Sequence, residues 1–167
     1  MASEDQDRFD LVVIGSGPGG YVCAIRAAQL GLRVACVEKD PTFGGTCLNV
    51  GCIPSKALLE STERYAMIQH DAAEHGLQVQ GLSFDLAQMM ARKSAIVEQL
   101  TGGIAQLFDK NGIAGVRGIG TLRDGQTVEV ASSEGVRTLH TDAIVIATGS
   151  SPAPLRGVDL DGERVGT

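Results

Sequence analysis

Residues 10–38 contain the feature that most constrains the fold, because they read as a strand, a glycine-rich turn, a helix and a second strand. Residues 10–14 form a short apolar run, the pattern of a strand buried on both faces. Residues 21–30 are rich in alanine and apolar side chains, and Gly31 is a suitable helix stop. Residues 33–37 form a second apolar run. This order predicts a βαβ unit and hence an α/β protein with a parallel sheet.

The turn between the first strand and the helix has the spacing GxGxxG, with glycine at 15, 17 and 20. Gly15 permits a tight turn, Gly17 lets the backbone approach a pyrophosphate, and Gly20 lets helix and strand pack closely. The helix N-terminus offers unpaired N–H groups to an anion. The loop therefore predicts a dinucleotide site, with a simple cluster of turn glycines as the alternative.

Glu38 ends the second apolar run, where a carboxylate can accept hydrogen bonds from an adenosine ribose. A 2′-phosphate at that position would face a like charge. FAD or NAD is therefore favoured over NADP, and the alternative is a solvated glutamate at a strand end.

Cys47 and Cys52 stand five positions apart. In an ideal α-helix their Cα atoms would be roughly 8–9 Å apart, whereas a disulfide needs them within about 7 Å. A bridge thus requires a bend, which is cheapest at Gly51. A helix that starts after Cys52 and carries Lys56 would favour a thiolate at Cys52. One alternative is a zinc site, for which the sequence offers no third or fourth ligand at the usual spacing. The other is a pair of unreactive thiols in the core.

The remaining chain reads as two helices, three strands in hairpins and a last buried strand. The second helix carries apolar residues at a mean spacing of about 3.5, which suits packing on its own domain or a subunit interface. The hairpins are separated by the turn signals Asp124-Gly125 and 132–135. The expected helices cover residues 55–75 and from 83 onward, and the expected strands cover 116–122, 127–130, 136–139 and 143–147.

Composition excludes several classes of function. Aromatic residues make up 4%, tryptophan is absent and the net charge is −6, so neither base stacking nor phosphate binding by a basic face is expected. No apolar run approaches the ~18 residues of a membrane span. The acidic start MASEDQDRF has no apolar stretch behind it, so we expect no targeting peptide and a cytoplasmic protein. Cys23 and Cys36 are expected to pack in the core.

The glycine loop, Glu38 and the segment GGTCLNVGCIPSK (44–56) together resemble the pyridine nucleotide–disulfide oxidoreductases. Within that family LNVGCIPSKALL and residues 100–104 are most similar to the dihydrolipoamide dehydrogenase branch, and the resemblance covers residues from about 9 to 165. It implies a Rossmann-like FAD-binding domain, with a parallel sheet plus a small β-meander, as the N-terminal part of a larger multidomain fold.

The resemblance also implies a site. Cys47 matches the interchange thiol that meets the substrate, Cys52 matches the charge-transfer thiol beside the flavin, and the two would form the redox-active disulfide. No metal is implied. The residues that match FAD contacts are Gly15, Gly17, Gly20, Glu38, Lys39, Gly44, Gly45, Thr46, Lys56, Gly120, Ala147, Thr148, Gly149 and Ser150.

The family activity that this implies is oxidation of dihydrolipoamide, with FAD as the bound cofactor and NAD⁺ as final acceptor. The partners would be the lipoyl group of a 2-oxoacid dehydrogenase complex and a second copy of the complete enzyme. Alternatives are a mercuric or glutathione reductase-like flavoprotein, a flavin-binding module without turnover and a thiol relay without flavin. None of the three histidines, His70, His75 and His140, matches the family's catalytic base.

The expected organisation is a flexible N-terminus (1–8), the FAD-binding domain (9–150) and the start of a connection to an NAD-binding domain (151–167). The NAD site would therefore lie outside this chain. The isolated 167-residue chain is expected to be inactive, since it has one GxGxxG loop and no matching base.

Overall fold

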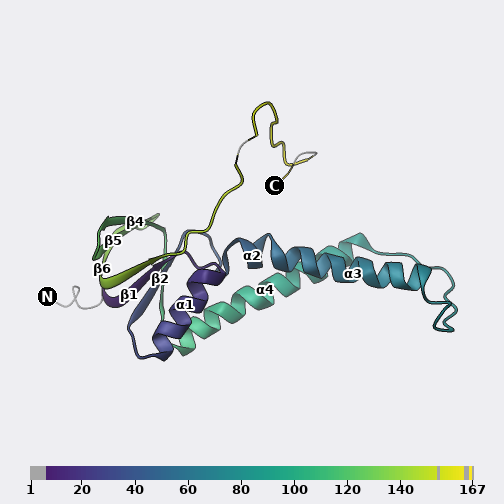
Figure 1. Cartoon of the computed structure of the whole chain (residues 1–167), viewed down its shortest axis with the longest axis horizontal. Helices are drawn as coiled ribbons and strands as arrows, with labels where there is room; N and C mark the ends of the chain where they lie inside the picture. Colours follow the sequence, from purple (N-terminus) through teal and green to yellow (C-terminus); the bar gives the residue numbers. More distant parts are fainter. Residues whose placement is uncertain (1–6, 154, 164–165, 167) are drawn as a thin grey trace.

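A computed structural model of the chain describes residues 7–153, 155–163 and 166, and within them it contains six strands and four helices. Figure 1 shows the sheet at one end of the molecule and a long pair of helices extending away from it. The elements are β1 (Arg8–Ile14), α1 (Pro18–Gln29), β2 (Val34–Glu38), α2 (Gly45–Asn49), α3 (Cys52–His70), α4 (Leu86–Lys110), β3 (Ala114–Arg117), β4 (Ile119–Asp124), β5 (Thr127–Ser132) and β6 (Gly135–Ile146).

One mixed sheet with the strand order β3-β2-β1-β6-β5-β4 holds the fold together. β1 lies between β2 and β6 and is parallel to both, with Val12 opposite Ala35 on one side and Ile144 on the other. β4, β5 and β6 pair antiparallel and form the predicted meander. The α/β prediction with a parallel sheet and a meander is confirmed.

β6 differs from the prediction, because the expected strands 136–139 and 143–147 form a single strand of 12 residues. Its first part pairs with β5 and its last part with β1, so the intervening residues stay extended. The expected strand 116–122 is instead two strands. It is interrupted at Gly118, whose φ of +144° takes the chain from parallel pairing with β2 to antiparallel pairing with β5.

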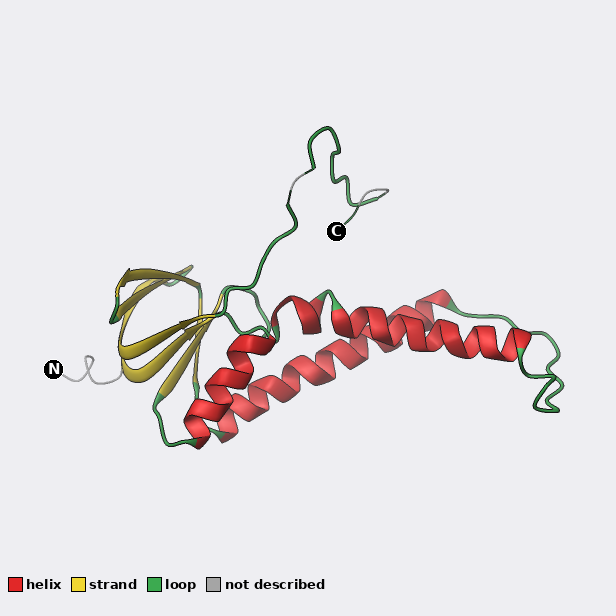
Figure 2. Ribbon diagram, viewed as in Figure 1, coloured by secondary structure: helices red, strands yellow, loops and turns green. Residues whose placement is uncertain are grey.

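The helices lie on one side of the parallel strands and the antiparallel strands curve over the other (Figure 2), and an apolar core fills each side. On one face Val13 and Cys36 pack with α1 and with Phe108 of α4. On the other face Val12 and Val37 pack against side chains of β5 and β6. The alternation follows the two-residue period of a strand, so each strand serves both cores and reads as a continuous apolar run.

α3 and α4 form a helical hairpin that is fastened by Arg92 of α4. Its guanidinium donates to the Ala57 carbonyl at 2.9 Å, to the Ser61 hydroxyl at 3.2 Å and to the Glu60 carboxylate at 2.5 Å. α4 begins after Asp85, whose carboxylate accepts from the Gln88 amide at 3.1 Å. Relative to the prediction, α3 starts and ends earlier and α4 starts slightly later.

The N-terminal boundary of the sheet is held by ion pairs. Asp7 pairs with Arg137 at 2.5 Å, and Arg8, the first residue of β1, pairs with Asp142 at 2.9 Å. Arg8 therefore belongs to β1 and Asp7 lies directly before that strand, whereas both were expected in a flexible segment; residues 1–6 of that segment lie outside the described residues. In the described part of the chain, no helix is long and apolar enough to cross a bilayer.

We predict that Phe108→Ala lowers the free energy of unfolding by about 3–5 kcal/mol, the usual cost of a large cavity in a core. The ring is 1% exposed, and its centroid lies 4.7 Å from that of Phe43. Urea unfolding followed by circular dichroism measures the loss. The matched control is Leu107→Ala on the same helix, which removes a side chain that is 41% exposed and should cost under about 1 kcal/mol. Equal losses would contradict the assigned core.

Candidate functional site

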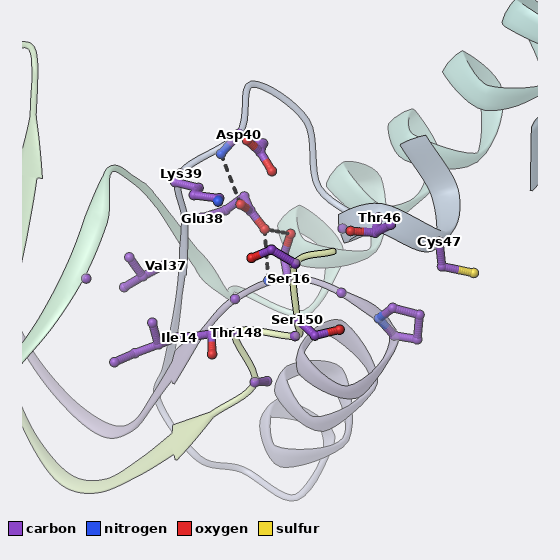
Figure 3. Close-up of a pocket in the computed structure, with 18 of the residues that line it drawn as sticks. Ile14, Ser16, Val37, Glu38, Lys39, Asp40, Thr46, Cys47, Thr148 and Ser150 are labelled. Atoms are coloured by element: carbon purple, nitrogen blue, oxygen red, sulfur yellow. Dashed lines mark hydrogen bonds between the residues drawn. The ribbon is translucent and has the colours of Figure 1, made fainter. Parts of the chain in front are cut away.

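A cleft of about 670 Å³ opens at the carboxyl ends of β1, β2 and β6 (Figure 3). From β1 the chain passes to β2 on one side of β1, whereas β6 pairs with the other side of β1. The cleft therefore lies at the point where the order of the strands in the sheet changes direction. In open α/β sheets this is the usual place for a ligand. The sequence-predicted residues that line it are Gly15, Gly17, Glu38, Lys39, Gly45, Thr46, Cys47, Cys52, Gly120, Ala147, Thr148, Gly149 and Ser150.

The glycine loop is built from close backbone packing. Gly15 has a φ of +97°, and a Cβ there would lie 2.3 Å from the Ala147 carbonyl oxygen. A Cβ on Gly20 would lie 1.8 Å from the Gly15 carbonyl oxygen. At Gly17, by contrast, the nearest atom to a Cβ would be 4.0 Å away, so this position is open. α1 begins directly after Gly17, and its N-terminal amides therefore lie beside the open position.

Glu38, at the end of β2, is 5% exposed yet lines the cleft. One carboxylate oxygen accepts from the Ser16 amide at 2.9 Å and the Ser16 hydroxyl at 2.5 Å, and the other accepts from the Asp40 amide at 3.0 Å. Burial raises the pKa of Glu38, but the hydrogen bonds from Asp40 and Ser16 outweigh it, so the pKa lies below its ordinary value. The residue is a charged acceptor at neutral pH.

The turn before α2 packs against the glycine loop. Gly44 and Gly45 have φ values of +108° and +59°, and a Cβ on Gly45 would lie 2.6 Å from the Cα of Gly17. Asn49, the last residue of α2, donates to the carbonyls of Phe43 at 3.3 Å and Gly45 at 2.9 Å and so closes this turn. Cys47 in α2 is thereby brought to the same cleft as Gly17.

Cys47 and Cys52 lie on separate helices, because the chain bends between α2 and α3 at Gly51, the residue at which the spacing predicted a distortion. Both side chains line the cleft. In this structure they are free thiols, so the predicted disulfide is not formed and stays a prediction for the oxidised protein.

The two thiols are close enough to interact. A hydrogen bond with the Cys52 side chain, followed by burial, raises the pKa of Cys47, while the Cys52 amide and the Lys56 charge oppose the rise. Two thiols that line one cleft from two helices joined at a bend suit a pair that can close to a disulfide and reopen.

Three predicted contact residues do not line the cleft. Gly20 is buried under the loop, and Gly44 lies behind it, with its amide donating to the Ser16 carbonyl at 3.0 Å. Lys56 is exposed on α3, one turn beyond Cys52. His70, His75 and His140 are exposed, and none lines this cleft.

The other two cysteines lie in or beside the core on the helix side of the sheet. Cys36 is fully buried, its thiol contacts the Gly15 carbonyl oxygen at 3.8 Å, and burial raises its pKa to about 12. Cys23 is half-buried against the same core. Both agree with the expected packing role. Among the described residues, no group of three or more His, Cys, Asp or Glu side chains is placed to hold a metal ion.

Several cleft residues were not singled out from the sequence. Ile14 is the last residue of β1, Val37 precedes the last residue of β2, and Asp40 lies two residues after Glu38. Ser16 is the variable position between the first two glycines of GxGxxG. Only the position of Ser16 inside the loop carried a signal that could have identified it. The other unpredicted lining residues are Pro18, Gly51, Gly118, Ile119 and Ser151.

Comparisons with known proteins agree on one family. The sequence model of the family described as pyridine nucleotide-disulphide oxidoreductase matches residues 9–166. A dihydrolipoyl dehydrogenase of Manduca sexta is 53% identical over 156 residues, 93% of this chain. A mitochondrial dihydrolipoyl dehydrogenase of Schizosaccharomyces pombe is 49% identical over 159 residues, 94% of this chain.

A flavoprotein disulfide reductase of Escherichia coli, solved as a Cu(II) complex, superposes with a TM-score of 0.74 at 25% identity, covering 89% of this chain and 30% of that one. The chain spans 31% of each of the two relatives named above. The expectation of a cytoplasmic protein was wrong, since several of the relatives are named as mitochondrial. The acidic first residues, on which that expectation rested, do not decide the compartment.

We predict that Cys52→Ala lowers the pKa of the Cys47 thiol, because it removes the side chain whose hydrogen bond is the largest cause of the rise. More Cys47 is then thiolate at pH 8, so alkylation by iodoacetamide becomes faster. Peptide mass spectrometry measures the rate at Cys47 alone. Cys23→Ala, which removes a thiol outside the cleft, should leave that rate unchanged. An unchanged or slower rate in Cys52→Ala would contradict the inferred contact.

Proposed function

The chain belongs to the pyridine nucleotide-disulphide oxidoreductase family, and from that membership we propose that it carries the FAD-binding and dithiol part of a dihydrolipoamide dehydrogenase. The observation that carries the proposal is the shared cleft. A glycine loop suited to a pyrophosphate and the thiols of Cys47 and Cys52 line the same cavity. Its volume of about 670 Å³ is that of a cofactor-sized site.

The residues at the cleft fit an adenine dinucleotide. The open side of Gly17 leaves room for phosphate oxygens beside the N-terminal amides of α1. Glu38 is held as a charged acceptor and would receive hydrogen bonds from ribose hydroxyls. Thr46 and the segment 147–150, which also line the cleft, would hold the remainder of the FAD.

The chemistry proposed for this chain is thiol–disulfide exchange. One thiol of dihydrolipoamide attacks the Cys47 sulfur of the oxidised pair, and Cys52 leaves as a thiolate. The second substrate thiol then attacks the mixed disulfide, which releases lipoamide and frees Cys47. Two electrons have then passed from substrate to protein; one of the two substrate protons ends on Cys47, and the other is released to solvent because Cys52 is left as a thiolate. FAD, when bound, supplies the group that accepts the electron pair.

Three parts of the proposal concern the whole protein. NAD⁺ would be the final acceptor, the lipoyl group of a 2-oxoacid dehydrogenase complex would be the substrate, and the complete enzyme would be a homodimer. Names of the relatives support the substrate. Because no histidine lines the cleft to accept the substrate proton, we expect the 167-residue chain by itself to show no lipoamide-dependent NAD⁺ reduction.

The test is the visible spectrum of FAD-loaded Cys47→Ser and Cys52→Ser variants. Cys47→Ser leaves Cys52 as the single cleft thiol, and we expect a long-wavelength charge-transfer absorption beyond the flavin bands. Cys52→Ser should lack this absorption. Each variant is the control for the other, because both remove one sulfur from the same cleft.

Failure of FAD to bind either variant or the parent chain would refute the proposed cofactor site. Flavin binding with equal spectra for the two variants would instead show that the roles assigned to Cys47 and Cys52 are wrong.

A further inference from the structure

We propose that Ser16 is a positioning residue for the nucleotide, and that its hydroxyl holds the Glu38 carboxylate in place as an acceptor for the ribose hydroxyls. The inference rests on the proposed FAD site and assigns a role to the residue between Gly15 and Gly17. That role belongs to the side chain, whereas the glycines of the loop act through their backbones.

The contact between the two residues is short and buried. Ser16 is 0% exposed, and its hydroxyl lies 2.5 Å from the same Glu38 oxygen that its amide contacts at 2.9 Å (Figure 3). Ser16 follows β1 directly, and Glu38 is the last residue of β2. The two hydrogen bonds therefore join the ends of adjacent parallel strands at the cleft.

A third contact settles where the hydroxyl proton points. The Gly44 amide donates to the Ser16 hydroxyl oxygen at 3.2 Å. An amide N–H can only donate, so the hydroxyl is the acceptor in that bond, and its single proton is left for Glu38. Ser16 thus connects the carboxylate to the turn that leads into α2 and Cys47.

The carboxylate depends on such donors because it is charged and nearly buried. None of the ion pairs among the described residues includes Glu38, so its charge is stabilised by hydrogen bonds from Ser16 and Asp40, with a further contribution from the Lys39 amide. If the Ser16 hydroxyl is removed, the Glu38 oxygen that it contacts keeps the Ser16 amide as its hydrogen-bond donor. Hydrogen bonds to charged groups are among the stronger ones, and their loss frees the side chain to change rotamer.

Ligand pairs that differ only in the ribose test this role. The dissociation constants of ADP and 2′,3′-dideoxy-ADP are measured by NMR titration of the parent chain, Ser16→Ala and Glu38→Gln. We expect the parent to prefer ADP by about tenfold, the usual value of a charge-assisted hydrogen bond. Ser16→Ala should lose most of that preference while binding dideoxy-ADP as the parent does. Glu38→Gln should lose the same preference for ADP. The double variant, Ser16→Ala with Glu38→Gln, should lose little more of that preference than either single variant.

Ser61→Ala is the matched control, because it removes a hydroxyl that bonds to Arg92 on the helical hairpin, far from the cleft. It should keep the full preference for ADP. Thermal unfolding of each variant verifies the fold. If Ser16→Ala does not fold, Ser16→Cys, a weaker donor of similar size, carries the same comparison.

If the Ser16 variant keeps the full preference for ADP, the role of Ser16 is refuted while the nucleotide site stands. Tighter ADP binding by that variant would also refute the role, because it would mean that the hydroxyl competes with the ribose for Glu38. Absence of ADP binding by the parent chain would overturn both this inference and the proposed nucleotide site.

Discussion

The site depends on a direct backbone contact between Gly45 and Gly17, with no side chain between them. Because of this contact, the glycine loop and the segment that carries Cys47 and Cys52 share one cleft. A Cβ on Gly45 would lie 2.6 Å from the Cα of Gly17. Thus the redox segment and the nucleotide loop, which are separate motifs in the sequence, line one cavity.

The layers around the sheet keep that cavity in place. α1 and α4 cover one face of the parallel strands, and the meander covers the other. β6 takes part in both arrangements, since it pairs with β5 and then with β1 before it ends at the segment 147–150. Three strands therefore deliver their carboxyl ends to the same edge, which is where parallel α/β sheets bind ligands.

Local patterns predicted the parts of the fold in which local sequence decides the structure. The βαβ unit followed from two apolar runs around a glycine loop, and the bend at Gly51 followed from the reach of a disulfide. The continuity of β6 was not predictable in this way, because a polar stretch stays extended there only through pairing on both sides. Ser16 was missed for a related reason: its partner Glu38 is brought near by the sheet. The roles of Cys47 and Cys52 came from the family resemblance, and the structure adds that both thiols line the cleft at the glycine loop.

A single NMR experiment tests whether the cleft is the cofactor site. FAD is titrated into the ¹⁵N-labelled chain, and the shift of every backbone amide is recorded. We predict that the largest shifts cluster on the segments that line the cleft, namely 15–17, 38–40, 45–52, 118–120 and 147–151. A small polar pocket beside His140 provides the contrast, because it lies outside the cleft. Shifts concentrated at that pocket, or no shifts at saturating FAD, would contradict the account.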